Sequence, residues 1–132
     1  IYVATSTGIA PMRAMLKDIE QWLLSSPEFK LVILQGVQTR EDILYREEWI
    51  ALAQKYKNVE CVFHLSRMQD NALLPHESHG YVQEAFSTLH LNPDEDYVYL
   101  CGNPCMIDQS FELLIAMGFK TTHIVREKYI SN

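Results

Sequence analysis

The sequence lacks the signatures of several common protein classes. No stretch holds more than two adjacent lysine or arginine residues and the formal net charge is −6, which argues against non-specific binding of nucleic acid. No apolar run approaches the ~18 residues of a membrane span, and no signal peptide is visible. The three cysteines are an odd number, which favours reduced thiols and a cytoplasmic location over a disulfide framework. With 48% hydrophobic residues, the 132-residue chain suffices for one domain with its own core.

Five short runs rich in β-branched and aromatic residues predict β-strands. They occupy residues 1–5, 30–37, 59–65, 96–101 and 122–127. Several are almost continuously apolar, as expected of parallel strands that are covered on both faces. Between them, apolar residues recur at helical spacing in segments 12–23, 41–56, 82–89 and 106–115. This alternation predicts an α/β fold, an open five-stranded parallel sheet with helices on both faces.

Ligands of such sheets bind beyond the carboxyl ends of the strands, so the residues that follow each strand are the functional candidates. The turn after the first strand, residues 5–11, carries three hydroxyls, one glycine and a proline suited to the first helical position. Its free backbone amides predict an anion site without a lysine, although an ordinary helix start explains the spacing equally well. Neither G-x-G-x-x-G nor a Walker A loop is present.

Two further strand ends carry candidate chemistry. Ser66 and Arg67 follow the third strand, and a hydroxyl beside a guanidinium suits a phosphomonoester, although surface exposure alone also accounts for an arginine. Cys101 and Gly102 follow the fourth strand, where a thiol next to a glycine can contact a planar ring. The alternatives for this cysteine are an inert buried thiol or a zinc site shared with Cys105. A zinc site needs two more well-placed ligands, and the histidines that could supply them are scattered along the chain. No metal site is therefore predicted.

In their order along the chain, the segments VATSTGIAPMRAML, GVQTREDILYREEW, LSR, GYVQEAF, YLCGNPCMID and REKY resemble the nucleotide-binding half of the ferredoxin–NADP reductase family. The resemblance implies a Rossmann-like three-layer NAD(P)-binding domain over residues 1–132. It implies hydride transfer between a nicotinamide nucleotide, NADP(H) rather than NAD(H), and a flavin, FAD or FMN. The flavin belongs to a separate barrel domain, whose R-x-Y-[ST] motif this chain does not contain. Electrons then pass to ferredoxin, flavodoxin or a similar redox protein, and this chain alone is expected to be inactive.

The resemblance also assigns residues to roles. The cofactor pyrophosphate is expected at the turn formed by Thr7, Gly8, Ile9, Ala10 and Pro11. The adenosine phosphate is expected at Ser66, Arg67 and Tyr81. The nicotinamide pocket is expected at Cys101, Gly102, Asn103 and Pro104. The catalytic residues are expected to be Cys101, Glu127 and Tyr129, the last stacking on the flavin. Ser6 stands where the family more often has glycine.

Three other functions are considered. An NADH-dependent reductase component of an oxygenase, or a flavin reductase, shares the fold and differs in nucleotide and electron acceptor. A non-catalytic nucleotide-binding sensor shares the turn but does not need the residues at the nicotinamide end. A phosphorylation receiver domain needs an acidic cluster on the first strand and an aspartate at the end of the third, and residues 1–5 and 59–65 supply neither.

Overall fold

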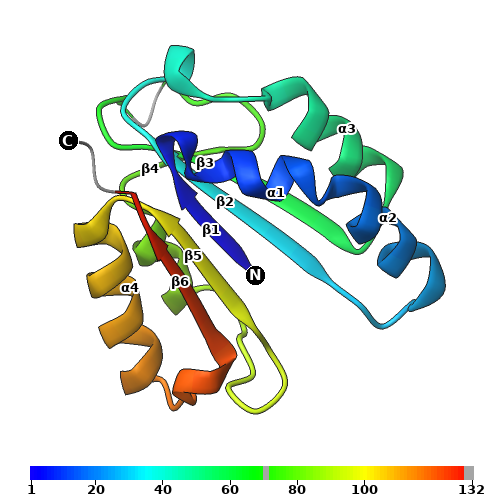
Figure 1. Ribbon diagram of the computed structural model, residues 1–132. Helices are drawn as coiled ribbons and strands as arrows, with labels where there is room; N and C mark the ends of the chain where they lie inside the picture. Colours follow the sequence, from blue (N-terminus) through cyan, green and yellow to red (C-terminus); the bar gives the residue numbers. More distant parts are fainter. Residues whose placement is uncertain (70–71, 130–132) are drawn as a thin grey trace.

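The computed structural model describes residues 1–69 and 72–129, and it shows a parallel sheet between two layers of helices (Figure 1). The sheet order is β4-β3-β2-β1-β5-β6, and every neighbouring pair is parallel. The strands are β1 (Tyr2–Thr5), β2 (Leu31–Val37), β3 (Val59–Leu65), β4 (Glu77–His79), β5 (Val98–Gly102) and β6 (Ile124–Lys128). The prediction of an α/β fold is confirmed, but the prediction of five strands was wrong.

The unpredicted strand is β4, at the edge of the sheet. It lies within residues 66–80, for which no strand was predicted, and residues 70 and 71 lie outside the described part of the chain. The strand is only three residues long and polar, with Ser78 paired to His64 of β3. An edge strand this short is fixed by its neighbour rather than by its own apolar pattern, so the sequence gives no period to detect.

The helical segments are α1 (Ala10–Ala14), α2 (Leu16–Ser25), α3 (Arg46–Lys55) and α4 (Pro104–Ala116), with 3₁₀ turns η1 (Ser6–Ile9), η2 (Arg40–Asp42), η4 (Val82–Ser87) and η5 (Thr121–His123). Three of these differ from the prediction. The first predicted helix is divided at Met15 into α1 and α2. The second helix begins at Arg46 rather than near residue 41, because Thr39 and Asp42 form a capping box around η2. The third predicted helix is a 3₁₀ segment, although its apolar residues Val82 and Phe86 are buried as expected.

Alternation along the strands divides the core between the two faces of the sheet. Tyr2, Ala4 and Ile33 pack with α1, α2 and α3 on one face, which lies to the right in Figure 1. Val3 and Leu34 point the other way and pack with α4 and η4. The strand order reverses between β1 and β5, and at this point the loops that follow the two strands diverge to opposite faces. The fold therefore leaves an opening at the carboxyl ends of β1 and β5.

Candidate functional site

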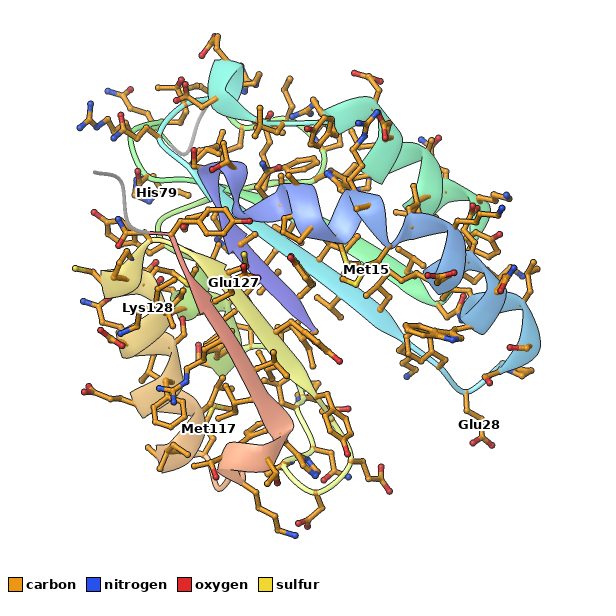
Figure 2. All side chains as sticks on the ribbon, in the orientation of Figure 1. Met15, Glu28, His79, Met117, Glu127 and Lys128 are labelled. Atoms are coloured by element: carbon orange, nitrogen blue, oxygen red, sulfur yellow. The ribbon has the colours of Figure 1, made fainter. Side chains whose placement is uncertain are left out.

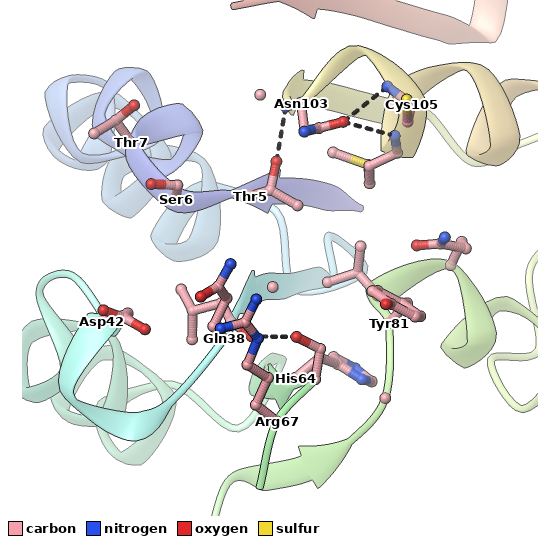
Figure 3. A pocket seen from close by; sticks show the side chains of 18 of the residues that line it. Thr5, Ser6, Thr7, Gln38, Asp42, His64, Arg67, Tyr81, Asn103 and Cys105 are labelled. Atoms are coloured by element: carbon pink, nitrogen blue, oxygen red, sulfur yellow. Dashed lines mark hydrogen bonds between the residues drawn. The ribbon is translucent and has the colours of Figure 1, made fainter.

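A cleft of about 1350 Å³ lies at these carboxyl ends. Each of the four central strands contributes to its walls through the residues that end or follow it. These include Thr5 to Thr7 after β1, Val37 and Gln38 after β2, Ser66 and Arg67 after β3, and Gly102 and Asn103 after β5. Figure 3 shows this cleft with the turn after β1 on one side and the segment carrying Tyr81 on the other. The residues that were predicted to be functional and that line this cleft are Thr7, Ser66, Arg67, Tyr81, Gly102, Asn103 and Tyr129.

The turn after β1 is held by close backbone contact. Gly8 lies directly against the carbonyl group of Cys101, and a Cβ atom there would overlap it. Ser6 has a φ of 49°, in the left-handed region that glycine adopts without strain. Of the five predicted pyrophosphate residues only Thr7 lines the cleft, together with Thr5 and Ser6, which the assignment had omitted. Gly8 and Ile9 are buried behind it, and the remaining two, Ala10 and Pro11, form the start of α1.

The loop after β5 is joined to β1 by a side chain. The hydroxyl Oγ1 of Thr5 accepts a hydrogen bond of 2.8 Å from the backbone N–H of Asn103. The amide oxygen of Asn103 accepts bonds from the N–H groups of Cys105 at 2.8 Å and Met106 at 3.4 Å, which caps α4, and Pro104 occupies its first turn. Between them Gly102 has a φ of 130°, and a Cβ atom there would overlap Thr5. Gly102 and Asn103 line the cleft as predicted.

Cys101 lies behind the cleft wall among hydroxyl groups. Its side chain is buried, and the thiol forms hydrogen bonds with the hydroxyls of Tyr2 and Tyr129. The Tyr2 hydroxyl also donates to the carbonyl of Gly8 at 3.1 Å. Burial raises the pKa of the Cys101 thiol, and the bond to Cys101, with burial, raises the pKa of Tyr129 to about 12. The cluster is therefore neutral at physiological pH, and it links the two backbone segments on either side of the strand reversal.

The predicted residues near the C-terminus lie beside this cluster. The backbone N–H of Tyr129 donates to the carbonyl of Gly102 at 2.8 Å, and Tyr129 lines the cleft. Glu127 pairs with Cys101 across the β5–β6 ladder. Figure 2 shows Glu127 and Lys128 on opposite sides of β6, and Lys128 forms an ion pair of 2.7 Å with Asp108 of α4. Glu127 therefore faces the same side of the sheet as Cys101.

The predicted phosphate residues lie at the other end of the cleft. Backbone bonds from Ser66 to Val37 at 3.1 Å and from Arg67 to Gln38 at 2.9 Å continue the β2–β3 pairing beyond both strands. Within residues 1–69 and 72–129, no ion pair or hydrogen bond joins the guanidinium of Arg67 to another residue. Tyr81 is exposed, and all three line the cleft (Figure 3). This end of the cleft therefore presents a cation, a hydroxyl and an aromatic ring, and the cation has no partner among the described residues.

A buried carboxylate holds the chain around this end. Glu77 of β4 has a fully buried side chain and forms ion pairs with Arg40 at 2.7 Å and Arg46 at 2.8 Å. It also accepts the backbone N–H of Leu74 at 2.9 Å, and these bonds, that to Arg40 first, lower the pKa of Glu77 to about 2. Arg40 further donates to the carbonyl of Ala72 at 2.6 Å. Residues 72–77 are thus fixed to η2 and α3.

His64 is one of the cleft residues to which the sequence prediction gave no role. It stands in β3, two residues before Ser66, with 5% of its surface exposed. Neither ring nitrogen has a hydrogen-bond partner. The available signal was a single polar residue in the otherwise apolar run VFHL, on the face of the strand that Ser66 continues. Gln83 and Gln109, joined by a 2.7 Å bond, were also not assigned and line the cleft near Tyr81.

Among residues 1–69 and 72–129, no group of three or more histidine, cysteine, aspartate or glutamate side chains could hold a metal ion. In the same residues no helix is both long and apolar enough to cross a bilayer.

The family model for the oxidoreductase NAD-binding domain matches residues 2–111, which include the turn after β1, Ser66, Arg67 and Cys101. The chain belongs to the oxidoreductase NAD-binding domain family. The NAD-binding domain is 30% identical over 136 aligned residues to ferredoxin–NADP reductase B of Sorangium cellulosum, covering 98% of this chain and 53% of that protein. It is 26% identical over 132 residues to the toluate 1,2-dioxygenase electron transfer component of Pseudomonas putida, covering 100% of this chain and 37% of that protein.

A solved structure shares the fold of this NAD-binding domain. The ferredoxin–NADP⁺ reductase of Neisseria gonorrhoeae, with bound FAD and NADP, superposes with a TM-score of 0.78 at 21% identity, over 96% of this chain and 54% of that one. The chain thus spans about half or less of the length of the relatives named here. The predicted resemblance to the nucleotide-binding half of ferredoxin–NADP reductases is confirmed.

Proposed function

We propose that this chain binds NADP(H) and is the nucleotide-binding half of a flavin-dependent reductase. The observation that carries the proposal is the guanidinium of Arg67, which lies beside Ser66 at the edge of the family's nucleotide cleft and has no partner in the described residues. A 2′-phosphate fits this pair because arginine supplies charge and paired donors. The exposed ring of Tyr81 offers an adjacent surface for the adenosine.

The rest of the cleft fits the rest of the nucleotide. The overlap that a Cβ atom at Gly8 would create shows how closely the turn approaches β5, and Thr5, Ser6 and Thr7 of the turn line the cleft. We assign the pyrophosphate to this turn, with Ile9, Ala10 and Pro11 shaping it from behind. The nicotinamide ring is assigned to the end formed by Gly102, Asn103 and Tyr129, above Cys101. Pro104 sets the direction of α4 there.

A bound nicotinamide supplies a hydride for transfer to the flavin of a second domain. The part of this chain in that reaction is to orient the ring and exclude water. Cys101 offers a buried, neutral thiol beneath the ring, Tyr129 covers the position until the ring enters, and Glu127 provides negative charge at the same edge. In the proposed whole protein, electrons pass onward to ferredoxin, flavodoxin or a similar acceptor, and the reaction takes place in the cytoplasm.

One observation favours a second candidate, a reductase that uses NADH. Glu41 and Asp42 also line the cleft, and carboxylates near a ribose disfavour a 2′-phosphate. Asp42 is occupied by Thr39, which donates to it from its backbone at 3.0 Å and its hydroxyl at 2.9 Å. The carboxylate left to oppose a phosphate is that of Glu41, and the cation of Arg67 offsets it.

Calorimetric titration of the chain with 2′-phospho-ADP-ribose and with ADP-ribose tests the proposal, because neither ligand needs a flavin. We expect tighter binding of the phosphorylated ligand by about tenfold or more, since a charge-assisted contact contributes about 1.5–3 kcal/mol. Arg67→Ala should abolish the difference. The matched control is Lys120→Ala, which removes a cation between α4 and η5, outside the cleft.

Each outcome has a distinct meaning. Equal affinities in the unmodified chain would favour the NADH-dependent reductase, and a preference that survives Arg67→Ala would remove the arginine from the phosphate site. No binding of either ligand would contradict the assignment of the cleft.

A further inference from the structure

His64 is buried in an environment that leaves its imidazole ring without hydrogen bonds. Its side chain is 5% exposed, and neither Nδ1 nor Nε2 has a hydrogen-bond partner. A neutral imidazole carries one donor and one acceptor, and burying both unpaired costs free energy. Such a group in a native fold calls for an explanation, and an absent ligand is one of them.

The position of the imidazole connects it to the phosphate end of the cleft. In the sheet His64 lies between Gly36 of β2 and Ser78 of β4. Side chains two residues apart leave a strand on the same face, so His64 and Ser66 share a side. Figure 3 shows the imidazole between Arg67 and the segment that carries Tyr81, and all of them line the cleft. The imidazole therefore borders the place assigned to the 2′-phosphate.

Burial and nearby charge act on the protonation of His64 in opposite directions. From η4, Glu84 favours the imidazolium, whereas burial favours the neutral ring and is the larger effect, so the pKa of His64 is lowered. The neighbouring strands present no charge beside it, since their facing residues are Gly36 and Ser78. Arg67 disfavours a second cation at the same edge. A ligand that neutralises Arg67 and adds negative charge reverses this balance.

We propose that His64 is a further residue of the phosphomonoester site, which takes up a proton when a 2′-phosphate binds at Ser66 and Arg67. The proposal rests on the proposed function, because it needs that phosphate in the cleft. Both ring nitrogens are shielded from water, so the coupling acts mainly through charge, and low-dielectric surroundings keep such coupling strong. A phosphomonoester with a second pKa of about 6 is mostly a dianion at neutral pH, and it supplies the charge that ADP-ribose lacks at this position.

The consequence is a nucleotide preference that depends on pH. As the pH falls towards and below the ordinary imidazole pKa of about 6.5, His64 becomes easier to protonate and the phosphorylated ligand binds more favourably than it otherwise would. Protonation of the phosphate itself opposes this trend. The contribution of His64 is therefore measured as the difference in affinity for the phosphorylated ligand between the unmodified chain and a variant that cannot take up the proton.

The experiment is calorimetric titration with 2′-phospho-ADP-ribose and with ADP-ribose at pH 6 to 8, in buffers of different ionisation enthalpy, which counts the protons bound. When the phosphorylated ligand binds, the unmodified chain should take up a larger fraction of a proton than His64→Gln does. When ADP-ribose binds, the two proteins should take up the same number of protons. His64→Gln should lose about threefold to tenfold of its affinity for the phosphorylated ligand near pH 6, and little at pH 8. His90→Gln, the same change at an exposed position outside the cleft, is the control.

If His64→Gln does not fold, the proposal can still be tested by NMR on the unmodified chain. The NMR titration of the His64 ring should give a higher pKa in the complex with 2′-phospho-ADP-ribose than in the free chain, and an unchanged pKa with ADP-ribose. If the phosphorylated ligand binds through Arg67 but proton uptake and ring titration are unchanged, the role of His64 is wrong and the proposed function stands. If neither ligand binds, the proposed function itself fails.

Discussion

At the end of the cleft where β1 meets β5, backbone lies against backbone, whereas at the end beyond β3 charged side chains face open space. Gly8 touches the carbonyl of Cys101, and Gly102 touches Thr5, so this first end tolerates almost no added atom. The second end presents Arg67 and Tyr81, whose exposed side chains are free of such contact. The difference teaches that the end proposed for the nicotinamide ring is specified by shape and the end proposed for the 2′-phosphate by charge, so substitutions at the two ends should have different effects.

The largest effect is expected from Gly102→Ala at the shape-determined end. Gly102 has a φ of 130°, which disfavours any side chain, and the new Cβ would also overlap Thr5. We expect a loss of about 3 kcal/mol in the free energy of unfolding, measured by urea denaturation. The control is Gly118→Ala, with a φ of 98° but no atom closer than 3.8 Å to the new Cβ, which should cost about 1 kcal/mol. Equal losses would show that crowding at this end is unimportant.

The next effect is expected from Glu77→Gln at the charge-determined end. The variant loses two ion pairs to a buried carboxylate, and we expect a loss of about 2 kcal/mol at pH 7. Because the pKa of Glu77 is lowered from 4.5 to about 2, its contribution is complete above pH 4.5 and declines as the pH falls towards 2. Unfolding curves of both proteins from pH 7 to 3 should therefore converge. Glu28→Gln, at an exposed carboxylate (Figure 2), should show no such convergence.

A smaller effect is expected from Thr5→Val, which keeps the shape of the side chain and removes the acceptor for the N–H of Asn103. The expected loss is about 1 kcal/mol in the free energy of unfolding. Binding of ADP-ribose should weaken as well, because the loops after β1 and β5 are no longer joined. Thr88→Val, whose hydroxyl donates to Ala85 outside the cleft, should leave binding unchanged. Unchanged binding in both variants would mean that the Thr5 bond does not position the site.

The smallest effect is expected at the shape-determined end, as a change in the pKa of Tyr129. Cys101→Ala removes the hydrogen bond that contributes most to the raised pKa of Tyr129, so that pKa should fall from about 12 towards 10. NMR of ring-labelled tyrosine follows the change, with Tyr129→Phe to assign the signal. Cys61→Ala, at a buried cysteine near His76, is the control. A Tyr129 pKa that does not move would show that the thiol and the hydroxyl are not bonded.

Particular residues show how far the sequence predicts the fold and the site. The five apolar strands and α4 with Gly118 after it are visible because buried parallel strands and a capped amphipathic helix leave periodic patterns. The edge strand β4 and the 3₁₀ form of η4 are set by tertiary contact and leave no such pattern. Because ligands of parallel sheets bind beyond the carboxyl ends of the strands, the sequence predicted one site from residues at different strand ends. The residues Ser66, Arg67, Gly102 and Asn103 do line the same cleft. His64 was not predicted because it lies within a strand rather than after one, and its unpaired nitrogens are visible only in three dimensions.

The division of the cleft among strands has a consequence for how the protein acquires its fold. The lining residues range from Thr5 to Tyr129, and the sheet pairs β1 with β5 across nearly three quarters of the chain. Contacts of such high sequence separation form late and slowly, because loop-closure entropy opposes them. No early intermediate therefore contains the complete cleft. A nucleotide that binds it selects the finished structure by mass action, and at one hundred times its Kd it adds about 2.7 kcal/mol to that state.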